Sequence, residues 1–163
     1  MNKELLDLGE RVGKLLKERS ETVAVAESST GGLIAAALLA VPGASAYFLG
    51  GAVVYTRRAR HLLMDLNKEA VTGMRSASEP YALLLAQTSQ KRFEATWGIS
   101  ETGATGPTGN PYGDPAGHSC LAVAGPVERV VTLRTGSNDR VENMVSFAMK
   151  SLETFEQVLS AKR

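Results

Sequence analysis

The sequence predicts an α/β fold, a three-layer α/β/α sandwich with a mixed, mostly parallel sheet of about five strands. Three observations support this prediction. Amphipathic helical repeats alternate with short β-branched runs along the 163 residues. Glycine-dense segments directly follow two of the predicted strands. The last three predicted strands leave little room for crossover helices, so we expect at least one antiparallel strand.

The first half of the chain alternates helix and strand. Leucine and valine repeat at helical spacing between charged residues over 3–19, which predicts an amphipathic helix. The β-branched run at 22–26 predicts a buried strand. The Ala/Leu-rich run at 30–40 predicts a buried helix that ends before a Pro-Gly pair. A second strand is predicted at 50–56, followed by a basic helix, "RRARHLLMDL", at 57–66.

The second half contains two more helices and the remaining strands. Residues 78–92 predict a helix with Ser78 as its N-cap and Pro80 in its first turn. Three further strands are predicted, at 95–102, 119–125 and 129–135. Apolar residues recur at helical spacing over 141–159 and predict a long closing helix.

Length and composition indicate one globular domain, residues 1–163, with 44% hydrophobic and 21% charged residues. The net charge of +1 gives no reason to expect a nucleic-acid or membrane partner. No apolar stretch approaches the roughly 20 residues of a membrane span, and the charged N-terminus lacks the apolar core of a signal peptide. The single Cys120 excludes an internal disulfide and fits a reducing compartment, so we expect a cytoplasmic protein.

The segment "AESSTGG" places many polar groups in the turn between the strand at 22–26 and the helix at 30–40. Open α/β sheets bind ligands at the carboxyl ends of their strands. The N–H groups of Thr30, Gly31 and Gly32 are therefore expected to hold an anion, with the glycines allowing close backbone approach. The alternative is that the serines and the threonine only cap the helix.

A second glycine-dense segment, "TGATGPTGNPYGDPAG" at 102–117, also follows a predicted strand. Two such segments at strand ends can face each other across one crevice, so we expect Ser28 and residues 103–109 to converge on one pocket. Glycine and proline crowd any long loop, so a plain connection made of turns is the alternative.

Taken in order, "AESSTGG", "PGASAYFLGGAVVYT", "SEPYA" and "TGATGP" resemble the C-terminal domain of the competence/damage-inducible protein CinA. The resemblance runs from about residue 5 to about residue 160. Stand-alone domains of this family are nicotinamide mononucleotide (NMN) deamidases, which convert NMN to nicotinic acid mononucleotide and ammonia. The resemblance implies a three-layer α/β/α fold, no metal, no cofactor, a serine nucleophile assisted by a lysine, and a homo-oligomer.

The same resemblance implies the site residues. Its catalytic positions fall on Ser28 as the nucleophile, Tyr55 and Arg60. Residues at the substrate-binding positions are Glu27, Ser29, Thr30, Gly31, Gly32, Arg57, Gly103, Thr105, Gly106 and Arg140. Ser29 stands where the family usually has cysteine. The expected partner is thus a small-molecule nucleotide, with no nucleic acid and no membrane.

This chain departs from the family pattern at three polar positions. The family reads approximately Y-S-N-x-x-K where this chain reads "YTRRAR", so Arg57 replaces an asparagine and Arg60 replaces the lysine. Asn138 stands at the arginine of the family's G-x-R, although Arg140 lies two residues on. An arginine stays charged in proteins, so Arg60 is suited to binding a phosphate or an oxyanion and is a poor general base.

Other residues offer alternative bases for the serine proton. His118 begins a predicted strand after the glycine-rich loop, and His61 follows Arg60 on a helix. Glu27 and Glu101 each end a predicted strand, and a buried carboxylate with a raised pKa can accept a proton. Glu101 is also a candidate ion-pair partner for Arg57 or Arg60.

Two functions therefore remain open. The first is an amidohydrolase that acts on NMN with Ser28 as nucleophile and an altered base. The alternative is a catalytically weak or inactive homologue that binds a nucleotide or another phosphate-bearing ligand in the same crevice. The sequence carries no phosphate-binding P-loop, no G-x-G-x-x-G, no G-x-S-x-G elbow and no cluster with metal-ligand spacing.

Overall fold

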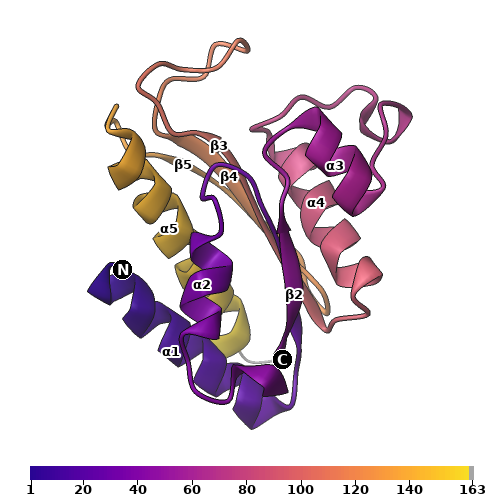
Figure 1. Ribbon diagram of the computed structural model, residues 1–163, viewed down its shortest axis with the longest axis vertical. Coiled ribbons are helices and arrows are strands. Elements are labelled where there is room, and N and C mark those ends of the chain that lie inside the picture. Colours follow the sequence, from indigo (N-terminus) through magenta and orange to yellow (C-terminus); the bar gives the residue numbers. More distant parts are fainter. Residues whose placement is uncertain (162–163) are drawn as a thin grey trace.

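A five-stranded sheet forms the centre of the molecule in the computed structural model, which describes residues 1–161 (Figure 1). The strands are β1 (Val23–Glu27), β2 (Phe48–Val53), β3 (Trp97–Ala104), β4 (His118–Ala124) and β5 (Arg129–Arg134). The helices are α1 (Lys3–Arg19), α2 (Leu33–Leu39), α3 (Arg57–Met64), α4 (Glu79–Arg92) and α5 (Arg140–Ser160). Two short 3-10 turns, η1 (Ala44–Ala46) and η2 (Glu69–Val71), complete the described elements.

The sheet is mixed, with strand order β2-β1-β3-β4-β5. β1 runs parallel to both of its neighbours, β2 and β3. β4 runs antiparallel to β3 and β5, so it is the one described strand that opposes the others. The predicted mixed and mostly parallel sheet, with its antiparallel strand among the last three, is therefore confirmed.

Helices cover both faces of the sheet, which confirms the three-layer prediction. Figure 1 shows α1, α2 and α5 on one face and α3 and α4 on the other. The largest apolar cluster lies under α1, α2 and α5, where Leu5, Val12 and Leu16 of α1 are fully buried with Trp97 of β3. These α1 residues recur at helical spacing, as the sequence pattern requires. No helix in the described chain is long and apolar enough to cross a membrane.

Two element boundaries differ from the sequence prediction at the site. The strand expected at 50–56 is β2, which ends at Val53, so that Tyr55 lies in the turn that follows. Thr56 then caps α3, because its side-chain oxygen accepts the Ala59 N–H at 3.0 Å. The helix expected from residue 30 begins only at Leu33.

Strand register places two acidic residues side by side. Ala26 of β1 pairs with Ser100 of β3, so the next residues, Glu27 and Glu101, are neighbours at the carboxyl end of β1. β2 runs in the same direction and ends at the same edge of the sheet. Residues 105–117, the loop between β3 and β4, project from this edge (orange, top of Figure 1). The fold thus gathers both glycine-dense segments at one edge.

Candidate functional site

Glu101 holds the turn that carries Ser28. Its buried carboxylate accepts the N–H of Ser28 at 3.1 Å and the N–H of Thr30 at 2.9 Å. The hydroxyls of Ser29 and Ser119 also donate to this carboxylate. Hydrogen bonds to a charged group are stronger than those between neutral groups. The bonds to Glu101 on β3 therefore fix the conformation of the turn.

Glu27 caps α2. Its carboxylate is 1% exposed and accepts the N–H groups of Ile34 and Ala35, both at 2.9 Å, and of Gly32 at 3.2 Å. The Gly31 N–H donates to the Ser28 carbonyl oxygen at 3.2 Å. The prediction that the N–H groups of Thr30, Gly31 and Gly32 hold a bound anion is therefore wrong, because each of them already donates to an oxygen atom of the protein.

The Thr30 hydroxyl joins the two carboxylates. Its oxygen lies 2.7 Å from Glu27 and 2.9 Å from Glu101, and a hydroxyl has one hydrogen to donate. Burial raises the pKa of Glu27, and the neighbouring charge of Glu101 acts in the same direction. The N–H groups of Ile34 and Ala35 oppose this shift. Glu27 thus holds a proton more readily than an ordinary glutamic acid.

One cavity of about 260 Å³, here called the Ser28 cavity, brings together five of the predicted site residues. These residues are Ser28, Tyr55, Arg57, Arg60 and Gly103. The remaining lining residues are Val54, Thr56, Ser76, Ala77, Tyr81, Thr102, Asn110, Pro111 and Tyr112. The two glycine-dense segments therefore meet at one cavity, as expected from their places at strand ends.

Arg60 contributes a buried charge to this cavity. The side chain is 8% exposed, its Nε donates to the Leu66 carbonyl oxygen at 3.2 Å, and its guanidinium lies 5.9 Å from the ring centroid of Tyr81. No carboxylate in residues 1–161 forms an ion pair with it, so the expected pair with Glu101 is absent. Because a buried charge without a counter-ion is unfavourable, Arg60 favours an anion in the cavity.

A neighbouring cavity of about 210 Å³, the Arg140 cavity, contains a second group of predicted residues: Tyr55, Gly103, Thr105, Gly106 and Arg140. The Arg140 guanidinium donates to the Gly106 carbonyl oxygen at 2.6 Å and to the Tyr55 hydroxyl at 3.2 Å. Arg140 therefore reaches the crevice from α5, whereas Asn138 lines neither cavity.

Five predicted substrate-binding residues lie outside both cavities: Glu27, Ser29, Thr30, Gly31 and Gly32. Gly31 and Gly32 have φ angles of +64° and +103°, which other residues rarely adopt. These residues shape the turn and its internal hydrogen bonds. Their role in this structure is to position Ser28.

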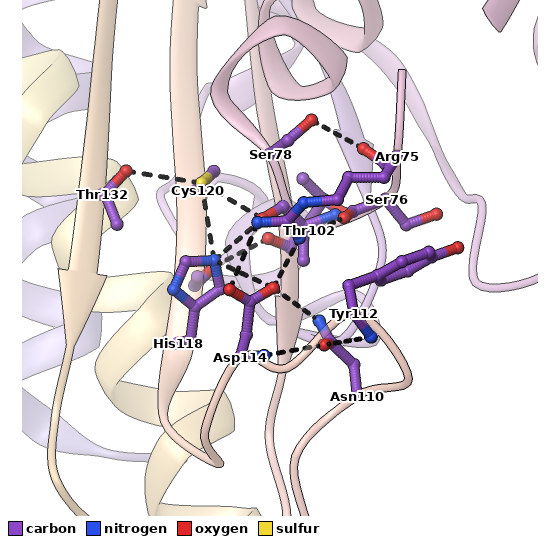
Figure 2. Close-up of polar contacts among 12 residues, drawn as sticks. Arg75, Ser76, Ser78, Thr102, Asn110, Tyr112, Asp114, His118, Cys120 and Thr132 are labelled. Carbon is purple, nitrogen blue, oxygen red and sulfur yellow. Dashed lines mark hydrogen bonds and ion pairs between the residues drawn. The ribbon is translucent and has the colours of Figure 1, made fainter. Parts of the chain in front are cut away.

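Asp114 anchors the loop between β3 and β4. Figure 2 shows its carboxylate between Arg75 and His118, with Asn110 beside it. Arg75 donates to it at 2.5 Å and Asn110 at 2.8 Å. Burial by itself would raise the pKa of Asp114, but the hydrogen bonds from Arg75 and Asn110 outweigh it and lower the pKa. The anchor fixes the residues at 110–112, which line the Ser28 cavity.

His118 belongs to this anchor and does not line the Ser28 cavity. Its Nδ1 accepts a hydrogen bond from Arg134 Nε at 3.2 Å, which assigns the ring hydrogen to Nε2. Nε2 then donates to the Ala77 carbonyl oxygen at 2.8 Å. The interpretation of His118 as an alternative base is not supported, because both ring nitrogens already have partners.

Sequence reasoning did not single out several residues around the cavity. Asn110 and Tyr112 line it, Asp114 fixes their loop, and Arg75 holds Asp114 while its guanidinium lies 5.5 Å from the Tyr112 ring centroid. The segment "NPYGDP" gave a weak indication of a binding role, because it places an aromatic residue among turn-forming residues, which favour the surface. Nothing in the sequence indicated that Arg75 would meet this loop.

Comparison with known sequences assigns the family. The family model of the CinA C-terminal domain matches residues 5–159. A CinA-like protein of Desulforapulum autotrophicum is 36% identical over 154 residues, which cover 93% of this chain and 36% of that protein. A CinA-like protein of Anaeromyxobacter sp. (strain K) is 38% identical over 148 residues, which cover 90% of this chain and 36% of that protein. The chain thus spans about a third of the length of these curated relatives.

Solved structures agree with this assignment. The competence/damage inducible protein CihA from Agrobacterium tumefaciens has a TM-score of 0.89 and 28% identity, covering 99% of this chain and 98% of that one. A CinA superfamily protein from Klebsiella pneumoniae also has a TM-score of 0.89, and at 24% identity it supports the fold alone. The match covers 98% of this chain and 99% of the Klebsiella chain. The chain belongs to the CinA C-terminal domain family.

Proposed function

We propose that the Ser28 cavity binds a phosphate-bearing pyridine nucleotide, with NMN as the ligand class that family membership favours. The observation that carries this proposal is the charge of the cavity wall. Arg57 and Arg60 line it together with Ser28, and its described lining includes no aspartate or glutamate. Guanidinium groups match the geometry of phosphate oxygens and bind them through paired hydrogen bonds.

Hydrolysis of the NMN carboxamide is a second candidate function, favoured by the place of Ser28 in the cavity. In this reaction the Ser28 oxygen adds to the carboxamide carbon and gives its proton to solvent water, and the Arg60 guanidinium stabilises the oxyanion. The C–N bond then breaks, and the nitrogen takes up a proton and leaves as ammonia. Water hydrolyses the acyl ester, which releases nicotinic acid mononucleotide and restores the serine.

The proton of Ser28 decides between the two candidates. The described lining of the Ser28 cavity includes no aspartate, glutamate, histidine or lysine. General-base assistance contributes roughly a hundred- to ten-thousandfold in rate. A guanidinium cannot supply it near neutral pH. Binding of NMN with weak hydrolysis is therefore the function that this geometry supports best.

Two measurements on the purified chain test the proposal. Calorimetry compares NMN with its phosphate-free nucleoside, and we expect NMN to bind at least about tenfold more tightly because only NMN offers a dianion to Arg57 and Arg60. Equal affinity for the two compounds contradicts the proposal. Ammonia release from NMN, compared between the wild type and Ser28→Ala, measures the second candidate. Release that is strong and depends on Ser28 would make hydrolysis the principal function.

A further inference from the structure

A larger cavity of about 730 Å³, here called the basic cavity, adjoins the Ser28 cavity. The two cavities share four lining residues: Arg57, Arg60, Ser76 and Tyr112. The basic cavity extends past these residues over α3 and the segment around η2. Nothing in the proposed binding of a mononucleotide requires this additional space.

The wall of the basic cavity is cationic. Arg58, His61 and Lys68 line it in addition to the shared Arg57 and Arg60. Its described lining residues include no aspartate or glutamate. The described lining of this half-open cavity therefore consists of neutral and basic residues. Such a wall repels cations and attracts ligands that carry more than one negative charge.

Arg60 connects the two cavities. Its charge is nine-tenths buried, and no carboxylate in residues 1–161 pairs with it. The hydrogen bond to Leu66 uses Nε, and the side chain of Tyr81 is a further polar neighbour of the guanidinium. Arg60 lines both cavities. A planar guanidinium with five N–H donors and no ion-pair partner is suited to an anion that bridges the junction.

Size points to a ligand larger than a mononucleotide. Ligand pockets usually enclose roughly 300 to 1,000 Å³. The Ser28 cavity, at about 260 Å³, lies just below this range, whereas the basic cavity, at about 730 Å³, lies well within it. The exposed aromatic ring of Tyr112 borders both cavities and offers a stacking surface between them.

We propose that the basic cavity is a subsite for a pyrophosphate group, and that the ligand is a dinucleotide whose pyridine end lies in the Ser28 cavity. This inference rests on the proposed function for the pyridine end and adds the second subsite. In this arrangement Arg57 and Arg60 bind the phosphate oxygens at the junction. Arg58 and Lys68 contact the second phosphate of the pyrophosphate group, and a mononucleotide would leave them without a partner.

Calorimetry with inorganic pyrophosphate and with nicotinamide adenine dinucleotide tests the subsite. The informative variant is Arg58→Ala/Lys68→Ala, because both residues line the basic cavity and neither lines the Ser28 cavity. We expect this variant to bind pyrophosphate and the dinucleotide at least about tenfold more weakly, because two charge-assisted contacts are lost. NMN affinity should stay within about twofold of the wild type. Lys91→Ala, an exposed lysine on α4 outside both cavities, is the matched control.

The outcomes separate this inference from the proposed function. Pyrophosphate that does not bind, or binds equally to the wild type and the double variant, overturns the subsite. NMN binding in the same preparation then shows that the proposed function survives. A dinucleotide that binds no more tightly than NMN also overturns the inference. Pyrophosphate binding that depends on Arg58 and Lys68, with no binding of NMN, would support the anion subsite. It would contradict the claim that the pyridine end of the ligand lies in the Ser28 cavity.

Discussion

At the residue scale, the proposed function depends on the side chain at position 60 for both binding and catalysis. Arg60 is buried between two cavities and keeps its charge, so it favours anions and cannot accept the proton of Ser28. A lysine is different, because burial lowers the pKa of an amine and allows it to act as a base. A lysine at this position would therefore suit a deamidase, and the arginine suits the proposed binding of an anionic nucleotide.

We predict that Arg60→Lys raises the rate of ammonia release from NMN. A gain of about tenfold is expected from partial recovery of general-base assistance. The gain is smaller than the full effect because lysine loses the bond to Leu66. Ser28→Ala in the same background should abolish the gain. A wild type that already hydrolyses NMN rapidly, with no change in Arg60→Ala, would show that another base operates.

A second prediction concerns Glu101. We expect Glu101→Ala to lower the free energy of unfolding by at least about 1–3 kcal/mol, since the buried N–H of Thr30 loses its acceptor and the half-buried N–H of Ser28 loses the same partner. NMN affinity should fall as well, because those N–H groups hold Ser28 and Thr30 in place. Urea denaturation measures the first effect and calorimetry the second. The exposed Glu4 provides the control variant Glu4→Ala, which should change neither quantity.

The sequence was sufficient to predict that Ser28 and Arg60 lie near one cavity, because each belongs to a short motif next to a strand end. The sequence did not predict that Glu101 accepts the N–H groups of the Ser28 turn. That residue is 71 positions from Thr30 along the chain, and only the parallel register of β1 and β3 brings them together. The same limit explains the wrong expectation of an ion pair between Glu101 and an arginine. Long-range register is not visible in local patterns.

At the scale of elements, the loop between β3 and β4 depends on one carboxylate. Asp114 joins this loop to Arg75, which precedes α4, and the loop residues Asn110 and Tyr112 then line the Ser28 cavity. A loop of this length is held mainly by such side-chain contacts, because it has little regular backbone hydrogen bonding. Loosening Asp114 should therefore loosen the wall of the cavity.

We predict that Asp114→Asn increases hydrogen exchange at residues 105–117 and leaves exchange in the central strands unchanged. The neutral amide cannot reproduce the charge-assisted bonds to Arg75, which are worth about 1.5–3 kcal/mol. NMN affinity should weaken by about threefold to thirtyfold as the wall becomes mobile. Asp7→Asn, at an exposed ion pair on α1, is the control. Unchanged exchange in the loop would contradict the anchoring role.

Element prediction succeeded where one periodicity dominated and failed at turns. The helix at 3–19 was expected with the observed boundaries, because its buried leucines recur every three or four residues. The strand expected at 50–56 ends at Val53 because Thr56 acts as the cap of α3, and a β-branched threonine also suits a strand. The late start of α2 follows from Glu27, whose carboxylate draws the helix N–H groups toward β1.

At the scale of the whole molecule, two buried carboxylates make opposite contributions to the pH dependence of stability. The pKa of Asp114 is lowered from its ordinary value of 3.8, so the unfolded chain binds its proton more tightly. Its contribution is present above pH 3.8 and is lost as the pH falls through the lower folded pKa. The pKa of Glu27 is raised from 4.5, so its contribution is present below pH 4.5 and is lost as the pH rises through the folded pKa.

We predict that Asp114→Asn and Glu27→Gln change different parts of the stability curve. Asp114→Asn should flatten the loss of stability below pH 3.8, and Glu27→Gln should flatten the decline above pH 4.5. Urea unfolding at closely spaced pH values measures the free energy of unfolding of each variant. The slopes of this free energy with pH are then compared, because a loss of stability that is the same at every pH does not change the slope. Curves that keep the wild-type shape in both variants would show that other groups dominate.

The Ser28 turn has a consequence for the time course of binding. Its N–H groups already donate to Glu101, Glu27 and the Ser28 carbonyl oxygen, so a ligand need not reorganise this backbone to enter. A preformed site binds in one step, whereas a site that must rearrange shows a rate that levels off with concentration. Stopped-flow mixing with NMN should therefore give a single exponential whose observed rate rises linearly with nucleotide concentration. A plateau in that rate would reveal a slow rearrangement before or after binding and would contradict the interpretation of the turn as preformed.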